Sequence, residues 1–176
     1  MSLPYLLLKS LRFDNLSRCF VSPKHIEDVW SKDEIHLASC DHHPPCPYIP
    51  GPKHPCGLYG TTSDKILQSY SEDADTAIFV MQCFGAHAEI WTEGARVKGM
   101  RPVAVVNPMT VPYREEYGST IFSNGTLVAA YAHKYFIDPN GMPIMMIDWQ
   151  SAHELVLRKH KELLEDPSYD VDTNSG

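Results

Sequence analysis

Cysteine and histidine side chains gather in one short stretch of this 176-residue sequence, between positions 40 and 56. Three of the five cysteines and three of the nine histidines lie there: Cys40, His42, His43, Cys46, His54 and Cys56. Zn2+ prefers thiolate and imidazole ligands, usually four of them in a tetrahedron. The residue types and their close spacing therefore predict a bound zinc ion. A surface loop whose cysteines merely pack is the alternative.

The same stretch contains six of the fourteen prolines, which restrict the conformations that its backbone can adopt. Proline fixes φ and lacks an N–H, so such a segment is neither a helix nor a central strand. We expect an irregular loop that prolines stiffen, which lowers the entropy lost when ligands converge. The preferred ligand set is Cys40, His43, His54 and Cys56. His42 and Cys46 stay open as alternatives.

The surplus of ligands bears on the role of the metal. Structural zinc sites are closed by four protein ligands, whereas catalytic sites keep one position open. Because two or more thiolates are available here, we expect a structural ion that pins the loop to the rest of the fold. A zinc hydrolase, with an open site and a glutamate as general base, is the alternative.

Composition bounds the class of protein and of partner. Hydrophobic residues make up 43% and charged residues 21% of the chain, as in ordinary globular proteins. The formal net charge is −7, which disfavours nucleic acid as a partner and leaves another protein as the expected one. An odd number of cysteines argues against a disulfide framework. The apolar run 3–8 is far shorter than the ~20 residues of a membrane span, so we expect a cytoplasmic protein.

The elements that would position the cluster are mostly strands. We expect strands over 10–21, 77–81, 86–92, 101–106 and 127–137, with helices over 22–30, 64–70 and from 151 to Pro167. Gly94 and Gly99 read as turns, and Asn124-Gly125 and Asn140-Gly141 as hairpin turns. Together these elements predict an α+β fold, a mostly antiparallel sheet with peripheral helices. One domain over 1–168 and a disordered tail over 169–176 complete the prediction.

Several of these residues also match a known sequence pattern. They are Cys40, His43-Pro44-Pro45, Cys56-Gly57-Leu58-Tyr59, Gly85 to Glu89 and Gly99-Met100-Arg101. Over residues 10–108 the chain resembles an uncharacterised family of small bacterial and phage proteins that carry a Cys…His-x-Pro…Cys-x-Cys-Gly motif, which is typical of a zinc site. His54 stands where that family has the first Cys of Cys-x-Cys-Gly, so the resemblance implies His54 as a ligand. Gly60 replaces the family's Ala, and the family has no activity to carry over.

Other polar residues offer weaker chemistry. His87, Glu89 and Glu93 share one parity on an expected strand and could form a pocket with Arg101. A solvated sheet face with a cross-strand Glu–Arg pair is the favoured interpretation. The stretch from Gly57 to Ser63 is similar to the nicotinamide-pocket segment of ADP-ribosyltransferase-like enzymes, which would give roles to Tyr59 and to Glu89 or Glu93. The leading hypothesis remains a zinc-stabilised protein-binding or regulatory module, with enzymatic activity left open.

Overall fold

A long antiparallel hairpin organises the sheet, and it consists of β6 (Thr76–Trp91) and β7 (Gly94–Val106). The computed structural model describes residues 2–23, 25–41, 43–51, 56–70, 75–112 and 118–167. Side chains of β6 alternate between two cores, because successive residues of a strand point to opposite faces. Phe79 and Met81 face one core, and Ile78 and Val80 face the other.

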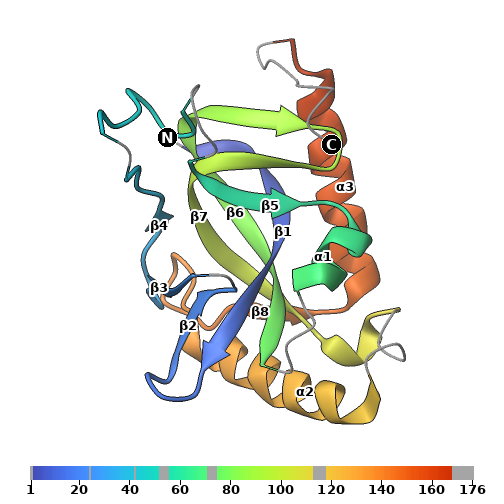
Figure 1. Ribbon diagram of the computed structural model, residues 1–176. Coiled ribbons are helices and arrows are strands. Elements are labelled where there is room, and N and C mark those ends of the chain that lie inside the picture. The colour runs from blue at the N-terminus through green and yellow to red at the C-terminus, as the bar shows by residue number, and fades with distance from the viewer. Residues whose placement is uncertain are drawn as a thin grey trace.

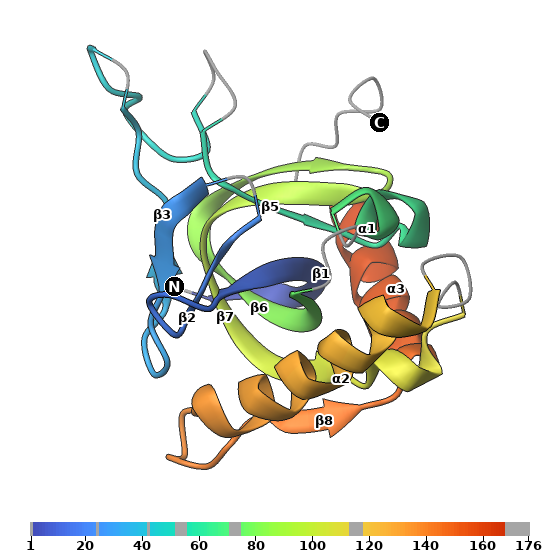
Figure 2. The ribbon, with the colours of Figure 1, turned by 60° about the horizontal axis from the view of Figure 1, so that its bottom comes forward.

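The sheet curls back on itself. β1 (Ser2–Asp14) pairs with β6 and also with β5 (Leu58–Thr61), and β5 pairs with β7, so these four strands form a closed circuit. Figure 2 shows this curvature around the core. The circuit is held least tightly between β1 and β5, which share one residue pair, Leu8 with Thr61. We call the closed circuit of β1, β6, β7 and β5 the barrel, and the junction of β1 with β5, where the two strands diverge, its seam.

Shorter strands extend the circuit on both sides. β2 (Cys19–Ser22) pairs with β1, and β3 (His25–Trp30) pairs with β2. β4 (His36–Leu37) and β8 (Met145–Ile147) both pair with β7. Among the described strands every pairing is antiparallel except that of β7 with β8. The predicted α+β class with a mostly antiparallel sheet is therefore confirmed.

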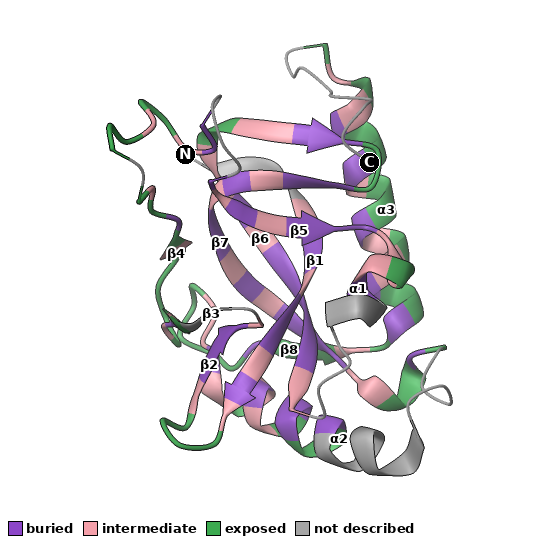
Figure 3. Cartoon of the chain, viewed as in Figure 1, coloured by how far each residue is buried: buried purple, intermediate pink, exposed green. Residues whose placement is uncertain are grey.

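Helices cover the sheet from different directions (Figure 1). They are α1 (Asp64–Tyr70), the 3-10 turn η1 (Pro108–Thr110), α2 (Gly118–Tyr135) and α3 (Trp149–Glu165). α3 begins at Asp148, whose carboxylate accepts the Ser151 N–H at 3.0 Å, and it ends just before Pro167. In Figure 3 the residues coloured as buried lie along the strands and at intervals along α2 and α3.

α2 packs on one core, whereas α3 contributes to both. Val128 and Ala132 of α2, Phe136 just after it and Leu163 of α3 belong to the large core that contains Phe20, Phe79 and Met100. Trp149, Ala152 and Val156 of α3 pack with Leu67 of α1 against the opposite face of β1, β6 and β7. Burying a large apolar side chain contributes roughly 1.5–3 kcal/mol, so these helices hold the curved sheet in shape.

The helix predicted over 22–30 is wrong, because this segment is the strand β3. Asp28 and Trp30 are turned inward while Glu27 and Val29 are exposed, a period of two. Ser22-Pro23 resembles a helix start but instead leads into the turn before β3. Pairing with β2, with Phe20 opposite Trp30, outweighs the local capping signal.

The hairpin turn at Asn124-Gly125 and the strand over 127–137 are also wrong, because α2 runs through both. Val128, Ala129, Ala132 and Phe136 are buried while Leu127 is 71% exposed, which is a helical period. The alanines favour the helix as well.

Several other predictions hold, but the strand predicted over 10–21 is interrupted by a turn over 15–18 between β1 and β2. Helix 64–70 matches α1, strand 77–81 lies in β6, and strands 86–92 and 101–106 lie in β6 and β7. Gly99 is no turn, since β7 continues through it opposite Leu37. A turn does form before Gly141, whose N–H donates to Asp138 at 3.0 Å. The predicted tail 169–176 lies outside the described residues.

Candidate functional site

Strand β7 holds both ends of the proline-rich loop that carries the cysteines. β4 pairs with Met100 and Gly99 of β7, and β5 pairs with residues 94–97 of the same strand. Both pairings use the edge of β7 that β6 leaves open, since β6 pairs with these same residues from the other side. The loop therefore leaves and returns at neighbouring points of one strand edge, and it projects away from the barrel between them (Figure 2).

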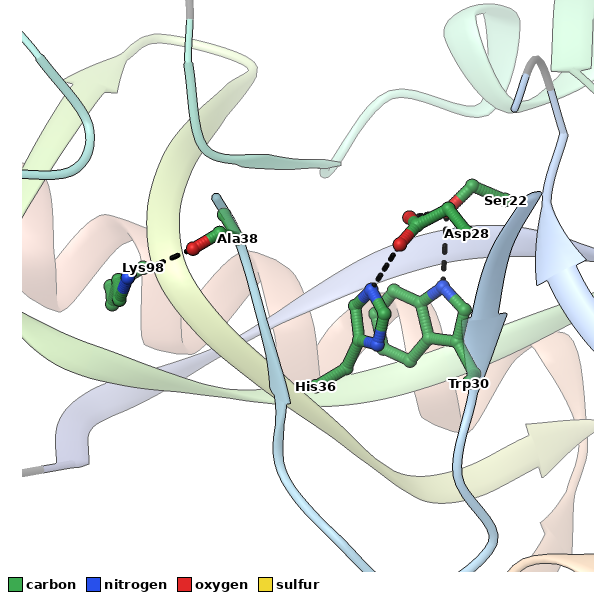
Figure 4. Close-up of polar contacts among 6 residues, drawn as sticks. All are labelled: Ser22, Asp28, Trp30, His36, Ala38 and Lys98. Atoms are coloured by element: carbon green, nitrogen blue, oxygen red, sulfur yellow. Dashed lines mark hydrogen bonds and ion pairs between the residues drawn. The ribbon is translucent and has the colours of Figure 1, made fainter. Parts of the chain in front are cut away.

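The first end of the loop is fixed just before Cys40. The Ala38 N–H donates to the Lys98 carbonyl at 2.8 Å, and the Lys98 ammonium donates back to the Ala38 carbonyl at 2.8 Å (Figure 4). At the other end Cys56 comes two residues before β5. Because strand pairing fixes both ends, the first and last cysteines of the loop are brought together across its neck.

Three thiols meet at this neck. The sulfur atoms of Cys40, Cys46 and Cys56 all lie within 4.8 Å of one another. Thiolates on a tetrahedral zinc with bonds of about 2.3 Å are roughly 3.8 Å apart, so the cluster fits such an ion. Cys56 is buried, while Cys40 and Cys46 are half-buried. None of the five cysteines, all of which are described, forms a disulfide.

Backbone geometry around Gly51 packs the cluster tightly. The Gly51 N–H donates to the Cys56 sulfur at 3.0 Å, and the Cys46 N–H donates to the Cys40 sulfur at 3.4 Å. A Cβ added at Gly51 would lie 2.1 Å from the Cys46 sulfur, well inside van der Waals contact. Only glycine fits here. Donors to the sulfurs also favour their thiolate form, as partners around a metal commonly do.

Electrostatics of the three thiols favour a cation. Burial, hydrogen bonding with Cys40 and Cys56, and repulsion by their thiolates raise the pKa of Cys46 to about 11. Cys46 therefore stays a neutral thiol at neutral pH when no metal is bound. A bound divalent cation reverses this preference and deprotonates the thiols that coordinate it. The cluster can therefore hold a metal ion.

The residues predicted as ligands are placed as follows. Cys40 and Cys56 belong to the cluster, and Cys46, the alternative, joins them. His43 is exposed and lies outside the group. His54 and His42 lie outside the described residues. The structure thus brings together three thiols.

The polar residues of the predicted strand face form a surface pair. Arg96 donates to Glu89 at 2.8 Å across the β6–β7 hairpin, and Tyr59 stacks on Trp91 with ring centroids 5.5 Å apart. Arg96 also lies over Trp91, 5.4 Å from the ring centroid. A cross-strand Glu–Arg pair therefore exists, but with Arg96.

The other members of that predicted group are dispersed. His87 is exposed and its ring lies 4.5 Å from Tyr48 of the loop, and Glu93 is exposed. Arg101 donates to the Ile137 carbonyl at 3.0 Å. These residues do not share one pocket, so the favoured interpretation of a solvated face fits their positions.

A partly buried polar network was not predicted from the sequence (Figure 4). Asp28 accepts hydrogen bonds from His36 at 2.8 Å and from the Ser22 hydroxyl. The Trp30 indole donates to Ser22 at 3.0 Å and stacks on His36, with ring centroids 4.1 Å apart. Burial would raise the pKa of Asp28, but hydrogen bonds from His36 and Ser22 outweigh it and lower that pKa. The carboxylate, whose side chain is 36% exposed, is thus held ionised by its two donors.

Lys9 brings a positive charge to the same region. It occupies β1 between the buried Leu7 and Leu11, and its ammonium donates to the Tyr59 carbonyl at 2.8 Å. This bond spans the seam at which β1 and β5 part. In the sequence, Lys9 can be recognised as unusual because it occupies the position between Leu7 and Leu11 where the alternation of the strand places a core residue.

No family model matches the chain, and neither a search of curated proteins nor one of solved structures finds a match. Within the described part of the chain, no helix is long and apolar enough to cross a membrane. The features that bear on function are therefore the sulfur cluster and the polar groups around Lys9 and Asp28.

Proposed function

We propose that the chain binds one Zn2+ through the thiolates of Cys40, Cys46 and Cys56 and one further ligand, and that this ion is structural. The observation that carries the proposal is the meeting of three sulfur atoms within 4.8 Å at the neck of the loop. Sulfur-rich sites select zinc among the abundant divalent cations, because magnesium and calcium prefer oxygen.

His54 is the proposed fourth ligand. It precedes Cys56 by two residues, so it belongs to the same end of the loop neck. The proposed kinship with the bacterial and phage family supports this choice, since that family has a cysteine at the same place. His43 is exposed and outside the sulfur cluster. Three thiolates and one imidazole make a closed structural set.

Closing the neck gives the metal its role. The chain from Cys40 to Cys56 would have to lose considerable entropy to keep one shape, and a clip between its ends removes much of that cost. With the neck closed, the loop presents a fixed surface that includes Tyr48, which is 43% exposed. Aromatic side chains are enriched where proteins meet. We therefore assign this loop to a protein partner, which makes the chain a protein-binding or regulatory module.

Metal analysis of the purified protein tests the site. We expect one zinc per chain, lost in Cys46→Ser and in His54→Ala. Cys19→Ser and His43→Ala are the matched controls, because each removes the same kind of side chain outside the proposed ligand set and should keep the zinc. A wild-type protein without stoichiometric zinc, or a Cys46→Ser variant that retains it, would contradict the proposal.

A second measurement separates a structural from a catalytic ion. After chelation, hydrogen exchange should accelerate in the loop between Ala38 and Leu58 and stay slow in the β6–β7 hairpin. Cobalt in place of zinc should show the spectrum of a closed tetrahedral thiolate site. A cobalt site that exchanges a water ligand would instead favour catalysis.

A further inference from the structure

A cavity opens where β1 and β5 part. Its volume is about 220 Å³, and its walls come from β1, β5, α1 and the turn between β2 and β3. This volume would hold roughly seven water molecules at about 30 Å³ each, so it suits a small ligand. Apolar side chains such as Leu58 and Leu67 line it beside the polar Lys9, Ser22 and Asp28. Small-molecule sites combine apolar walls with polar groups that orient the ligand, and this cavity offers both.

Lys9 is the amine of this cavity. Odd-numbered residues of β1 face the large core, as Leu7 and Leu11 do, and Lys9 lies between them. The Lys9 ammonium has three N–H donors, and one of them forms a hydrogen bond to the Tyr59 carbonyl at 2.8 Å. This bond holds the amine at the seam of the barrel, where it lines the cavity.

The surroundings make this amine more reactive than a surface lysine. Burial lowers the pKa of Lys9 to about 8, although the charge of Asp28 on β3 opposes that change. At pH 7 about one-tenth of the amine is then neutral, against about 0.04% of an exposed lysine with its usual pKa near 10.4, roughly a 200-fold difference. The neutral amine is the nucleophile, and buried lysines of this kind form Schiff bases.

Asp28 supplies a fixed carboxylate in the same cavity. His36 and Ser22 each donate to one of its oxygens, and the Trp30 indole holds Ser22 in turn. A carboxylate oxygen can accept two hydrogen bonds, so each retains room for a ligand hydroxyl. An amine and an ionised carboxylate facing one cavity suit a ligand with a carbonyl for the first and a hydroxyl for the second.

We propose that this cavity is a covalent binding site for a small hydroxylated aldehyde or ketone, with Lys9 as the attacking amine. The lone pair of the lysine nitrogen forms a bond to the carbonyl carbon, and the carbonyl oxygen takes a proton. That oxygen then leaves as water with the second amine proton, and a C=N double bond remains. Asp28 accepts the hydroxyl of the ligand and orients the carbonyl toward the amine. The proposal is independent of the metal.

Reductive trapping tests it on the whole protein as purified. Wild-type protein is treated at pH 7 with limiting glycolaldehyde and cyanoborohydride, and each lysine is scored by peptide mapping. We expect Lys9 to gain a hydroxyethyl group at least tenfold faster than Lys134 and Lys161, which are exposed. This margin leaves room for slower access within the 200-fold advantage. Equal or slower labelling of Lys9 would overturn the proposal without any variant.

A second probe tests the role of Asp28. Acetaldehyde lacks the hydroxyl, so the ratio of glycolaldehyde to acetaldehyde labelling should be higher at Lys9 than at Lys134. Asp28→Asn should slow labelling of Lys9 and abolish that preference while Lys134 reacts as before. An unchanged ratio in a folded Asp28→Asn protein would remove Asp28 from the site. Lys9→Met, which fits between two leucines, should lose the fast label, and persistence of that label would contradict the assignment.

Discussion

Replacing Gly51 by alanine should disrupt the sulfur cluster although every cysteine is retained. The added Cβ would lie 2.1 Å from the Cys46 sulfur, 2.5 Å from its Cβ and 3.1 Å from the Cys56 sulfur. Non-bonded heavy atoms prefer about 3.5–4.0 Å, so Cys46 must retreat by about 1.5 Å. A metal site tolerates deviations of only about 0.2 Å in its ligand distances. Cys46 therefore cannot stay within bonding distance of an ion held by Cys40 and Cys56.

The expected loss can be bounded. Disturbing groups that only support metal ligands costs about 10–100-fold in affinity, so displacing a ligand itself should cost at least about 100-fold. Zinc affinity is measured by competition with a chromophoric chelator, and thermal unfolding is followed with and without excess chelator. Wild type should be clearly more stable with zinc than without it, and Gly51→Ala should show a much smaller difference. Overpacking alone should cost the metal-free variant about 1–3 kcal/mol.

Gly125→Ala is the matched control for this substitution. Gly125 lies within α2, and among the residues that the structure describes a Cβ there would meet only Pro108, at 3.8 Å or beyond. This variant should keep the zinc and gain slightly in stability, because alanine is the better helix former. If Gly51→Ala bound zinc as wild type does, the sulfur geometry described here would not be the metal site.

Three further substitutions probe the barrel. Burial lowers the pKa of His160 in the folded chain. Below about pH 6.5 the unfolded chain therefore binds a proton that the folded chain does not, and the free energy of unfolding falls. Melting curves from pH 7.5 to about 5.5 should show a smaller loss of stability for His160→Gln than for wild type. Glu89→Gln should cost less than about 1 kcal/mol in urea unfolding, since its partner Arg96 and Glu89 are both partly exposed. Trp30→Phe removes the donor to Ser22 and should cost about 1–3 kcal/mol by the same measurement.

Local patterns predicted the fold class because strong apolar alternation and capping survive in the structure. The run from Ala77 to Met81 is buried within β6, and α1 begins after Ser63, whose hydroxyl accepts the Ile66 N–H at 3.3 Å. The signals that failed were local ones overruled by packing. Asn124-Gly125 favours a hairpin turn by itself, yet the helical spacing of Val128, Ala132 and Phe136 against the large core determines the outcome.

The site was predicted in outline, since sequence spacing shows which residues are near each other along the chain but not how a loop folds back. Cys46 meets the other two sulfurs because Gly51 allows a close approach, which is a three-dimensional property. Lys9 was overlooked because the expected strand began at residue 10. Because β1 in fact begins at Ser2, Leu7, Lys9 and Leu11 lie on one face of the strand, and this alternation places a charged residue at a core position.

The two sites share one segment of chain, and this links loop to barrel. Cys56 provides a thiol to the cluster, while Tyr59, three residues later, accepts the hydrogen bond from Lys9. Between them Gly57 has φ +115°, a conformation that favours glycine, and the segment at once enters β5. β5 meets β1 at a single pair, while its other edge is paired with β7 from Leu58 to Thr61. The β7 pairing therefore holds the carbonyl that positions the amine, and an ion bound at the loop neck would add a second restraint at the start of the same segment.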